Sequence, residues 1–182
     1  KIFSFFLAYD DVTWDHSKSE DEVKELKVEA KIFYSEEELL FSYLQHCKEE
    51  AYDIVAGWNS DGFDTPYIIN RCQKLFGDRT TASHLSPFSE INEYETKDQF
   101  FNRIIQYNII GSNYMDYMKI YKSMVPTNQE TYKLDHIAHV ELGKRKIGYE
   151  ESKSLYNLYR ENFQKFCDYN IQDTNIMKEL DE

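Results

Sequence analysis

Two segments of this sequence carry residues whose types and spacing could do chemistry. The first runs from Asn59 to Arg71 and places Asp64 just before a predicted helix. An aspartate in this position can cap the helix, because its side-chain oxygen accepts hydrogen bonds from the first backbone N–H groups. The same carboxylate can instead lie at the mouth of a sheet and hold a metal ion. The residues of this segment leave both interpretations open.

The second segment, Tyr169 to Asp173, lies in a predicted helix, where a spacing of four residues puts the phenol and the carboxylate on one face. At about 100° per residue, the apolar face comprises Phe166, Tyr169, Asp173, Ile176, Met177 and Leu180, and the opposite face Gln164, Asp168, Gln172, Asn175 and Glu179. Asp173 is therefore expected to point inward. A buried carboxylate is costly unless it is paired, hydrogen-bonded or bound to a cation. A structural salt bridge or capping contact for Asp173, and a core position for Tyr169, are the alternatives to catalytic roles.

The elements that precede the first segment follow from apolar runs and their boundary residues. Residues 2–9 are predicted as a partly buried strand, and residues 10–27 as an acidic, polar connector. Ser35 and Glu38 form a capping box, which predicts the start of a helix over residues 36–50.

Strand, turn and helix then follow one another around Asp64. Residues 53–58 are an apolar run that ends in a turn signature, which predicts a buried strand. Thr65 as the N-cap and Pro66 as the first helical residue predict a helix over 66–76, which Gly77 ends. This arrangement presents loop residues at the C-terminal end of a strand.

The rest of the chain is predicted as a hairpin followed by helices. Apolar alternation on both sides of a charged tip predicts a long β-hairpin within residues 86–111, with its tip at residues 95–99. Three helices are predicted after it, over residues 113–124, 133–142 and 154–180, the last with a break near residues 161–163. His136 and His139 share one helix face and could bind zinc, but no third ligand accompanies them, so an ordinary structural helix is the favoured interpretation.

Length and composition restrict the class of protein. A chain of 182 residues with 41% hydrophobic and 16% aromatic residues predicts one folded domain. Three cysteines without a short CxxC spacing favour a reducing, intracellular location, and no apolar run is long enough to span a membrane. The net charge of −12 argues against broad binding of duplex DNA. It favours a site for divalent cations, or DNA delivered by another domain, although solvated helix faces account for most acidic residues.

The combined motifs resemble a known family. The series N-x-x-x-F-D-x-P-Y-I-x-x-R from Asn59 to Arg71, followed about a hundred residues later by Y-x-x-x-D from Tyr169 to Asp173, is similar to the second and third exonuclease motifs of family B DNA polymerases. The order of the intervening segments resembles the T-even phage type: the hairpin, then residues 115–122, 126–129 and 134–137. The likeness spans nearly the whole chain.

The resemblance implies a fold, a reaction and a set of residue roles. The fold would be α/β of the ribonuclease H-like type, with a mixed sheet flanked by helices and a β-hairpin insertion, and residues 1–182 would form one 3′-5′ exonuclease domain. The reaction would be proofreading hydrolysis of the 3′-terminal phosphodiester of DNA with two Mg²⁺ or Mn²⁺ ions. Asp64 and Asp173 would be metal ligands, and Tyr169 would position the attacking water.

The resemblance also implies contacts with DNA and with other proteins. Asn59 and Phe63 would line the channel for single-stranded DNA, and Arg103 and Lys97 near the hairpin tip could meet phosphate. The hairpin would help part the primer end from the template, whereas a hairpin that merely completes the sheet is the alternative. Partners would be the single-stranded 3′ end, primer-template DNA, the remainder of the polymerase chain and, through the full enzyme, a sliding clamp. No membrane is implied, and the location would be intracellular, in the host cytoplasm if the protein is viral.

One motif of the family is missing from its expected place. The first motif, an Asp-x-Glu on a central strand, supplies two of the four carboxylates and should precede Asn59. The acidic residues there do not have this form within an apolar strand, and Glu29 and residues 36–38 are expected in helices or loops. Residues 2–9 would then be the third strand of the sheet, with the first two strands absent. The isolated chain is expected to bind metal weakly and to have little nuclease activity. The alternative is a non-catalytic DNA-binding or assembly module of a split polymerase.

Overall fold

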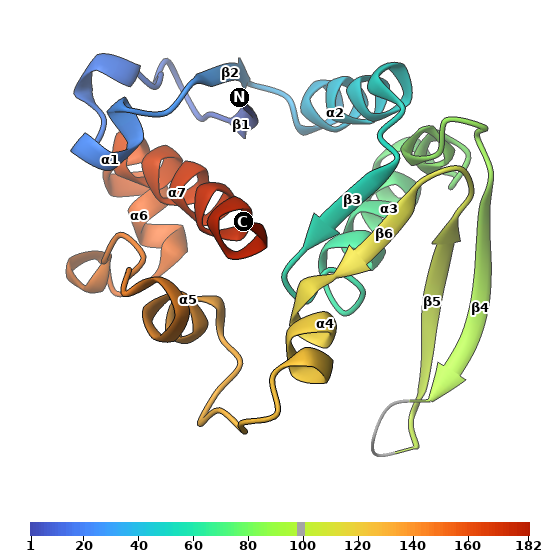
Figure 1. Cartoon of the computed structure of the whole chain (residues 1–182). Coiled ribbons are helices and arrows are strands. Elements are labelled where there is room, and N and C mark those ends of the chain that lie inside the picture. The colour runs from blue at the N-terminus through green and yellow to red at the C-terminus, as the bar shows by residue number, and fades with distance from the viewer. Residues whose placement is uncertain (98–100) are drawn as a thin grey trace. The chain divides into compact units, whose positions relative to one another are not determined.

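The computed structural model describes residues 1–97 and 101–182, which divide into two units. Unit 1 comprises Lys1–Leu39 and Glu130–Glu182, and unit 2 comprises Leu40–Gln129. Both contain strands and helices, so the expected α/β class is confirmed (Figure 1).

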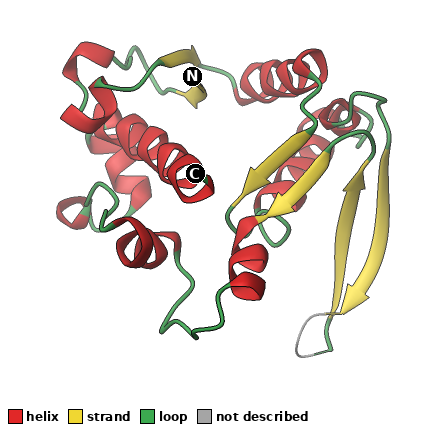
Figure 2. Ribbon diagram, in the orientation of Figure 1, coloured by secondary structure: helices red, strands yellow, loops and turns green. Residues whose placement is uncertain are grey.

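Unit 1 is built mainly of helices around one parallel strand pair (Figure 2). Its elements are β1 (Ile2–Leu7), η1 (His16–Lys18), α1 (Asp21–Lys24), β2 (Val28–Phe33), α5 (Leu134–Leu142), η3 (Glu150–Ser152), α6 (Leu155–Glu161) and α7 (Phe163–Asp181). β1 and β2 pair in parallel from Ile2 opposite Val28 to Leu7 opposite Phe33. Apolar residues of β1, α1 and α7, including Phe6, Val23 and Ile171, form its core. Removal of this apolar surface from water stabilises the unit.

Two expectations for unit 1 are wrong. Glu29, expected in a helix or loop, lies in β2, where burial alternates between successive residues and Glu29 points outward to pair with Lys1 at 2.5 Å. The faces of α7 are also different from the predicted ones. Asp168 and Gln172, expected outward, are buried, because side chains and backbone of the segment before β2 hydrogen-bond to them.

Unit 2 holds the second parallel strand pair and the hairpin. Its elements are most of α2 (Glu36–Glu50), β3 (Ile54–Gly57), α3 (Asp64–Phe76), η2 (Thr81–Leu85), β4 (Ile91–Lys97), β5 (Arg103–Ile109), β6 (Asn113–Asp116) and α4 (Tyr117–Met124). β3 and β6 are parallel, from Ile54 opposite Asn113 to Gly57 opposite Asp116. β4 and β5 are antiparallel, from Ile91 opposite Ile109 to Lys97 opposite Arg103. The core joins Leu44 of α2, Ile69 and Cys72 of α3 and Ile109 of β5.

Several predicted elements are confirmed and others need correction. The helix over 36–50, the hairpin, the helix break at Asn162 and the end of α3 at Gly77 agree with the structure. α3 begins at Asp64 with Phe63 as its N-cap, so the assignment of Thr65 as N-cap is wrong. The predicted helix over 113–124 begins with the strand β6, because residues 113–116 pair with β3. Residues 95–97, predicted as part of the hairpin tip, belong instead to β4 and pair with residues 103–105. The rest of the predicted tip, residues 98 and 99, lies outside the described residues.

The strand pairings match the expected mixed sheet only in part. Within residues 1–97 and 101–182, the strands form three two-stranded sheets, two of them parallel and one antiparallel. β3, expected to be buried, leaves Ile54 60% exposed. The absence of two further strands stays a prediction. No described helix combines the length and the apolar character that crossing a membrane requires.

A matched pair of glycines tests the turn that joins β5 to β6. Gly77 and Gly111 both have positive φ values, of 79° and 89°. A Cβ at Gly77 would meet nothing within 4 Å, whereas one at Gly111 would lie 2.6 Å from the Phe88 ring and 2.8 Å from Pro87 Cγ. We expect Gly77→Ala to lower the free energy of unfolding by about 1 kcal/mol through backbone strain alone. Gly111→Ala should cost about 1–3 kcal/mol more, because the neighbouring rings must move. Urea denaturation of both variants measures this, and equal losses would contradict the close packing at Gly111.

Candidate functional site

The turn between β3 and α3 is held by its own backbone. Asn59 has a positive φ of 62°, a conformation that asparagine tolerates better than most residues. The carbonyl of Asn59 accepts hydrogen bonds from the N–H groups of Gly62 and Phe63, both at 3.1 Å. The carbonyl of Ser60 accepts one from Thr65 N–H at 3.0 Å. The chain therefore reverses within a few residues and presents Asp64 on the first turn of α3.

Asp64 is the first residue of α3, and the N-cap residue is Phe63, which makes no side-chain capping hydrogen bond. Its side chain is solvent-accessible at the surface. The surrounding protein nonetheless removes part of its hydration, and this desolvation, followed by the nearby carboxylate of Asp116, raises the pKa of Asp64 above its ordinary value. A hydrogen bond from the backbone N–H of Asp64 itself to this carboxylate opposes the rise. A helix-terminal role and a metal-binding role for Asp64 both stay predictions.

Asn59 and Phe63 both precede Asp64 in the chain, and both are exposed. Phe63 is 63% exposed, and its ring stacks on that of Tyr67 with centroids 5.8 Å apart and an interplanar angle of 14°. A pair of stacked rings at the surface is a flat platform on which a planar group can stack. The predicted DNA-binding residue Arg103 lies elsewhere in unit 2, at the start of β5, where it pairs with Glu95 at 3.1 Å.

Asp116 is a residue that the motif search did not single out. It ends β6, caps α4 and is only 4% exposed. Its Oδ1 accepts hydrogen bonds from the backbone N–H groups of Asn59 at 3.1 Å, Met118 at 3.0 Å and Lys119 at 3.4 Å. Its Oδ2 is buried without a hydrogen-bond partner in the described part of the chain. A signal was present in the sequence, since an aspartate directly before an amphipathic helix is a typical N-cap.

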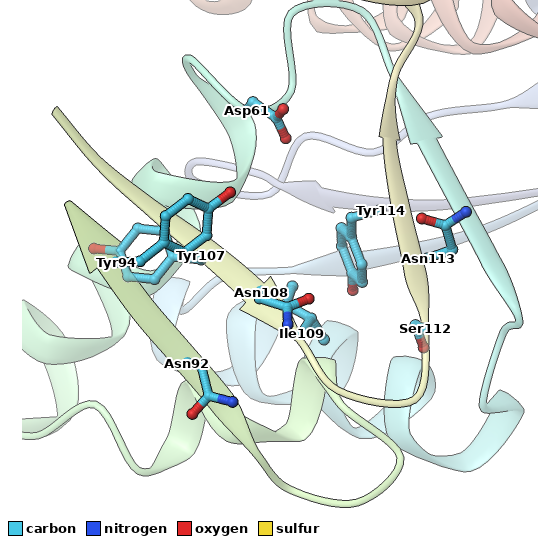
Figure 3. Close-up of a pocket in the computed structure, with 9 residues that line it drawn as sticks. All are labelled: Asp61, Asn92, Tyr94, Tyr107, Asn108, Ile109, Ser112, Asn113 and Tyr114. Carbon is cyan, nitrogen blue, oxygen red and sulfur yellow. The ribbon is translucent and has the colours of Figure 1, made fainter. Parts of the chain in front are cut away.

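A polar pocket adjoins the turn. It measures about 380 Å³ and is lined by Asp61, Asn92, Tyr94, Tyr107, Asn108, Ile109, Ser112, Asn113 and Tyr114. Figure 3 shows Asp61 at one end, with Tyr107 of β5 and Tyr114 of β6 below it. Asp61 Oδ2 accepts a hydrogen bond from Lys119 Nζ at 2.7 Å, which links the turn to α4. None of the nine lining residues is lysine or arginine.

Tyr169 and Asp173 lie side by side on α7, as their spacing predicts. Lys146 Nζ donates a hydrogen bond to Asp173 Oδ2 at 2.6 Å and one to Tyr169 Oη at 3.4 Å. The ring of Tyr149 packs edge-on against Tyr169, with centroids 5.5 Å apart. Burial, and then the carboxylate of Asp173, raise the pKa of the Tyr169 phenol, so it keeps its proton at neutral pH.

Asp173 is half-buried and incompletely satisfied. Burial raises its pKa above the ordinary value, and the ammonium group of Lys146 opposes this rise without cancelling it. Its Oδ1 is buried and accepts no hydrogen bond from the residues that the structure describes. The structural alternative, a salt bridge, is thus present at one oxygen only. The other oxygen can accept a cation.

The predicted site residues fall in both units. Tyr169 and Asp173 are neighbours in unit 1, whereas Asp64, Asn59 and Phe63 are neighbours in unit 2. Their convergence on one cleft stays a prediction. Across residues 1–97 and 101–182, no group of three or more His, Cys, Asp and Glu residues is arranged to hold a metal ion, so His136 and His139 of α5 belong to no such group.

Comparison with known proteins decides the family. The family described as DNA polymerase family B, exonuclease domain, matches residues 9–137. The chain belongs to this family. Its relatives include the DNA-directed DNA polymerase of Escherichia phage RB69, which is 34% identical over 149 residues, and that of Enterobacteria phage T4, 29% identical over 150 residues. Each match covers 82% of the chain and 16% of the phage polymerase. The DNA polymerase of Thermococcus litoralis is 28% identical over 148 residues, covering 80% of this chain and 8% of that protein.

The family match covers one of the two candidate segments and ends before the other. The matched residues 9–137 contain the turn with Asn59, Phe63 and Asp64, and also Arg103 and Asp116. Tyr169 and Asp173 follow the matched stretch, so their assignment depends on the motif and on the geometry around Lys146. The family implies a ribonuclease H-like fold.

The ion pair of Lys146 with Asp173 gives a pH-dependent prediction. Because burial raises the pKa of Asp173 above its unfolded value, this carboxyl favours the native chain most at acid pH. That contribution is lost as the pH rises through the folded pKa. Lys146→Met should raise this pKa further and cost about 2 kcal/mol at pH 7, with a smaller loss at pH 4.

Lys144→Met is the matched control, because Lys144 pairs with Glu179 at 2.7 Å rather than with Asp173. Unfolding in buffers without divalent cations, combined with NMR titration of the Asp173 carboxyl carbon, measures both quantities. An unchanged Asp173 pKa in Lys146→Met would show that the pair has no electrostatic role.

Proposed function

We propose that this chain is the proofreading 3′-5′ exonuclease domain of a replicative family B DNA polymerase, acting on the 3′-terminal phosphodiester of DNA. The observation that carries the proposal is the match of residues 9–137 to the exonuclease domain family, because that stretch contains the turn with Asp64. The chain spans about a sixth of the length of its phage relatives, at 16%. That the whole protein polymerises DNA is therefore part of the proposal, and so is the assignment of residues 1–182 to a single domain.

The carboxylates in the chain are suited to Mg²⁺ or Mn²⁺, the cofactors of the proposed reaction. Asp173 has a buried oxygen without a hydrogen-bond partner among the described residues, and desolvation raises the pKa values of both Asp64 and Asp173. Such groups gain most from a hard cation, which prefers oxygen ligands. Two bound ions would supply charge stabilisation at the scissile phosphodiester and lower the pKa of water. Asp64 and Asp173 would be their ligands in this chain.

The other residues of the proposed site hold water and DNA. Tyr169 keeps its proton and hydrogen-bonds to Asp173, and its hydroxyl would position the attacking water beside this carboxylate. The exposed ring of Phe63, stacked on Tyr67, offers a surface to an unpaired base, and Asn59 supplies an amide next to it. Lys146 neutralises Asp173 and keeps this carboxylate in place.

The proposal includes the partners of the whole enzyme. These are the single-stranded 3′ end, primer-template DNA, the remainder of the polymerase and, through the full enzyme, a sliding clamp. An intracellular location accords with DNA replication. The hairpin β4–β5, with Arg103 and Lys97 opposite one another, would meet DNA as the primer end is parted from its template.

A second candidate is a non-catalytic module of a split polymerase. Residues 1–182 contain no Asp-x-Glu, which favours a chain that binds DNA or completes another polypeptide without cutting DNA itself. The apolar Ile54 on β3, at 60% exposure, suits pairing with a further strand at that position.

The role of the two aspartates is tested in the polymerase that contains this chain. We expect Asp64→Asn and Asp173→Asn each to lower the rate of single-stranded DNA degradation at least about 100-fold, while primer extension stays within about twofold. Asp53→Asn is the control, because Asp53 is an exposed carboxylate of the same unit. Exonuclease rates on a 3′-labelled oligonucleotide with Mg²⁺ measure the effect. Full activity in both site variants would remove these residues from the reaction.

The ligand count gives a separate prediction for the 182-residue polypeptide alone. With Asp64 and Asp173 as its two ligands, it should bind Mn²⁺ weakly and release no nucleotides from single-stranded DNA. Mixing with a polypeptide that carries an Asp-x-Glu strand should restore cleavage. Isothermal titration with Mn²⁺ and a nuclease assay before and after mixing distinguish the two candidates. Cleavage by the 182-residue chain alone would contradict the need for further carboxylates.

A further inference from the structure

The junction between β6 and α4 is tied to the turn that carries Asp64. Gly57, the last residue of β3, lies opposite Asp116, the last residue of β6, in the parallel pairing. This register places the Asp116 side chain beside the first residues of the turn. Its Oδ1 accepts the N–H of Asn59 at 3.1 Å, while the same oxygen caps α4 through Met118 and Lys119.

Asn59 is the residue of the turn that most needs such an acceptor. Its φ of 62° turns the chain away from the direction of β3, so its N–H is not part of the ladder that pairs β3 with β6. The Asn59 carbonyl in turn accepts the N–H groups of Gly62 and Phe63. One carboxylate oxygen therefore holds the residue on which the rest of the turn is built.

Two further contacts join the turn to α4. Lys119 Nζ donates to Asp61 Oδ2 at 2.7 Å, and the ring of Trp58 lies against that of Tyr121, with centroids 6.1 Å apart. All three contacts join the segment 58–61 to residues 116–121. The Asp116 contact differs from the other two because its acceptor is a carboxylate that is only 4% exposed, and hydrogen bonds to an ionised acceptor are stronger than neutral ones.

We propose that Asp116 is a positioning residue, which holds Asn59 in its left-handed conformation and so sets the direction in which Asp64, Asn59 and Phe63 are presented. The inference rests on the proposed function for its catalytic consequence. It goes beyond capping of α4, because a cap needs only the N–H groups of Met118 and Lys119. Asp116 would not touch metal or DNA, and it would act through the turn.

Three variants separate the two duties of Asp116. Asp116→Asn keeps a side-chain oxygen of the same reach, so it can cap α4 and bind Asn59 N–H. Asp116→Ser caps helices well, but its hydroxyl is one bond shorter and should cap α4 without reaching Asn59. Ser154→Ala removes an equivalent cap from α6, where Ser154 Oγ accepts the N–H of Asn157 at 3.1 Å, and controls for a general loss of stability.

Both readouts use the complete polymerase that contains this chain. Hydrogen–deuterium exchange of peptides that span residues 58–64 reports the Asn59 N–H. We expect faster exchange there in Asp116→Ser, and native exchange in Asp116→Asn and Ser154→Ala. At saturating single-stranded DNA with Mg²⁺, kcat for nucleotide release should fall about 10-fold to 100-fold in Asp116→Ser, because a displacement of about 1 Å can cost that much. Asp116→Asn should stay within about threefold of the native kcat, with KM little changed in either variant.

The results of these experiments distinguish a failure of the positioning role from a failure of the proposed function. Native exchange at residues 58–64 in Asp116→Ser overturns the positioning role, whatever the nuclease assay shows. Faster exchange with an unchanged kcat also overturns it, because the turn would then not set the position of Asp64. If the native polymerase releases no nucleotides, the proposed function fails, and the exchange result alone decides whether Asp116 holds the turn.

Discussion

A carboxylate that is removed from water must receive hydrogen bonds or a cation, and Asp168, Asp116 and Asp173 meet this constraint in different ways. Asp168, at 1% exposure, is fully satisfied: Trp14 Nε1 donates to one oxygen at 2.7 Å and the N–H of Glu20 to the other at 3.0 Å. Asp116 and Asp173 each have one satisfied oxygen and one buried oxygen without a partner in the described residues. Asp168 therefore has a structural role and joins α7 to the segment before β2 by hydrogen bonds. Asp173, in contrast, retains the capacity to bind a cation.

The pairing of two short parallel strands explains how the Asp116 carboxylate meets its hydrogen-bond donor in the turn. β3 and β6 contribute four residues each, and their register ends with Gly57 opposite Asp116. Parallel strands cannot be joined by a tight hairpin, so α3 and the β4–β5 hairpin fill the connection between them. The carboxyl ends of both strands then reach the same edge, which brings Asp116 to the N–H of Asn59. Strand pairing thus acts on the Asp64 segment through the Asp116 side chain, beside the contacts that α4 makes through Lys119 and Tyr121.

Local signals predicted the elements that depend on local interactions, and tertiary contacts decided the others. The capping box at Ser35, the stop at Gly77 and the alternation of the hairpin are properties of neighbouring residues, and they were read correctly. The buried face of α7 is not such a local property, because the helical period of its apolar residues alone predicts a different face. Asp168 and Gln172 are buried by donors on Trp14, Glu20 and Ile147, which are distant in sequence. The spacing of Tyr169 and Asp173 was sufficient to predict their shared face, but not the ammonium group of Lys146 between them.

Charge finally limits how this chain can meet DNA. Three basic groups near the candidate residues are already paired with acids: Lys146 with Asp173, Lys119 with Asp61 and Arg103 with Glu95. With a net charge of −12, the chain has little positive potential to draw in a phosphate backbone. In the proposed function, stacking on Phe63, amide groups such as that of Asn59, and divalent cations held by carboxylates would therefore add to the few basic contacts of the hairpin. Under the proposed proofreading role, the long-range attraction for DNA would therefore come from parts of the protein other than residues 1–182.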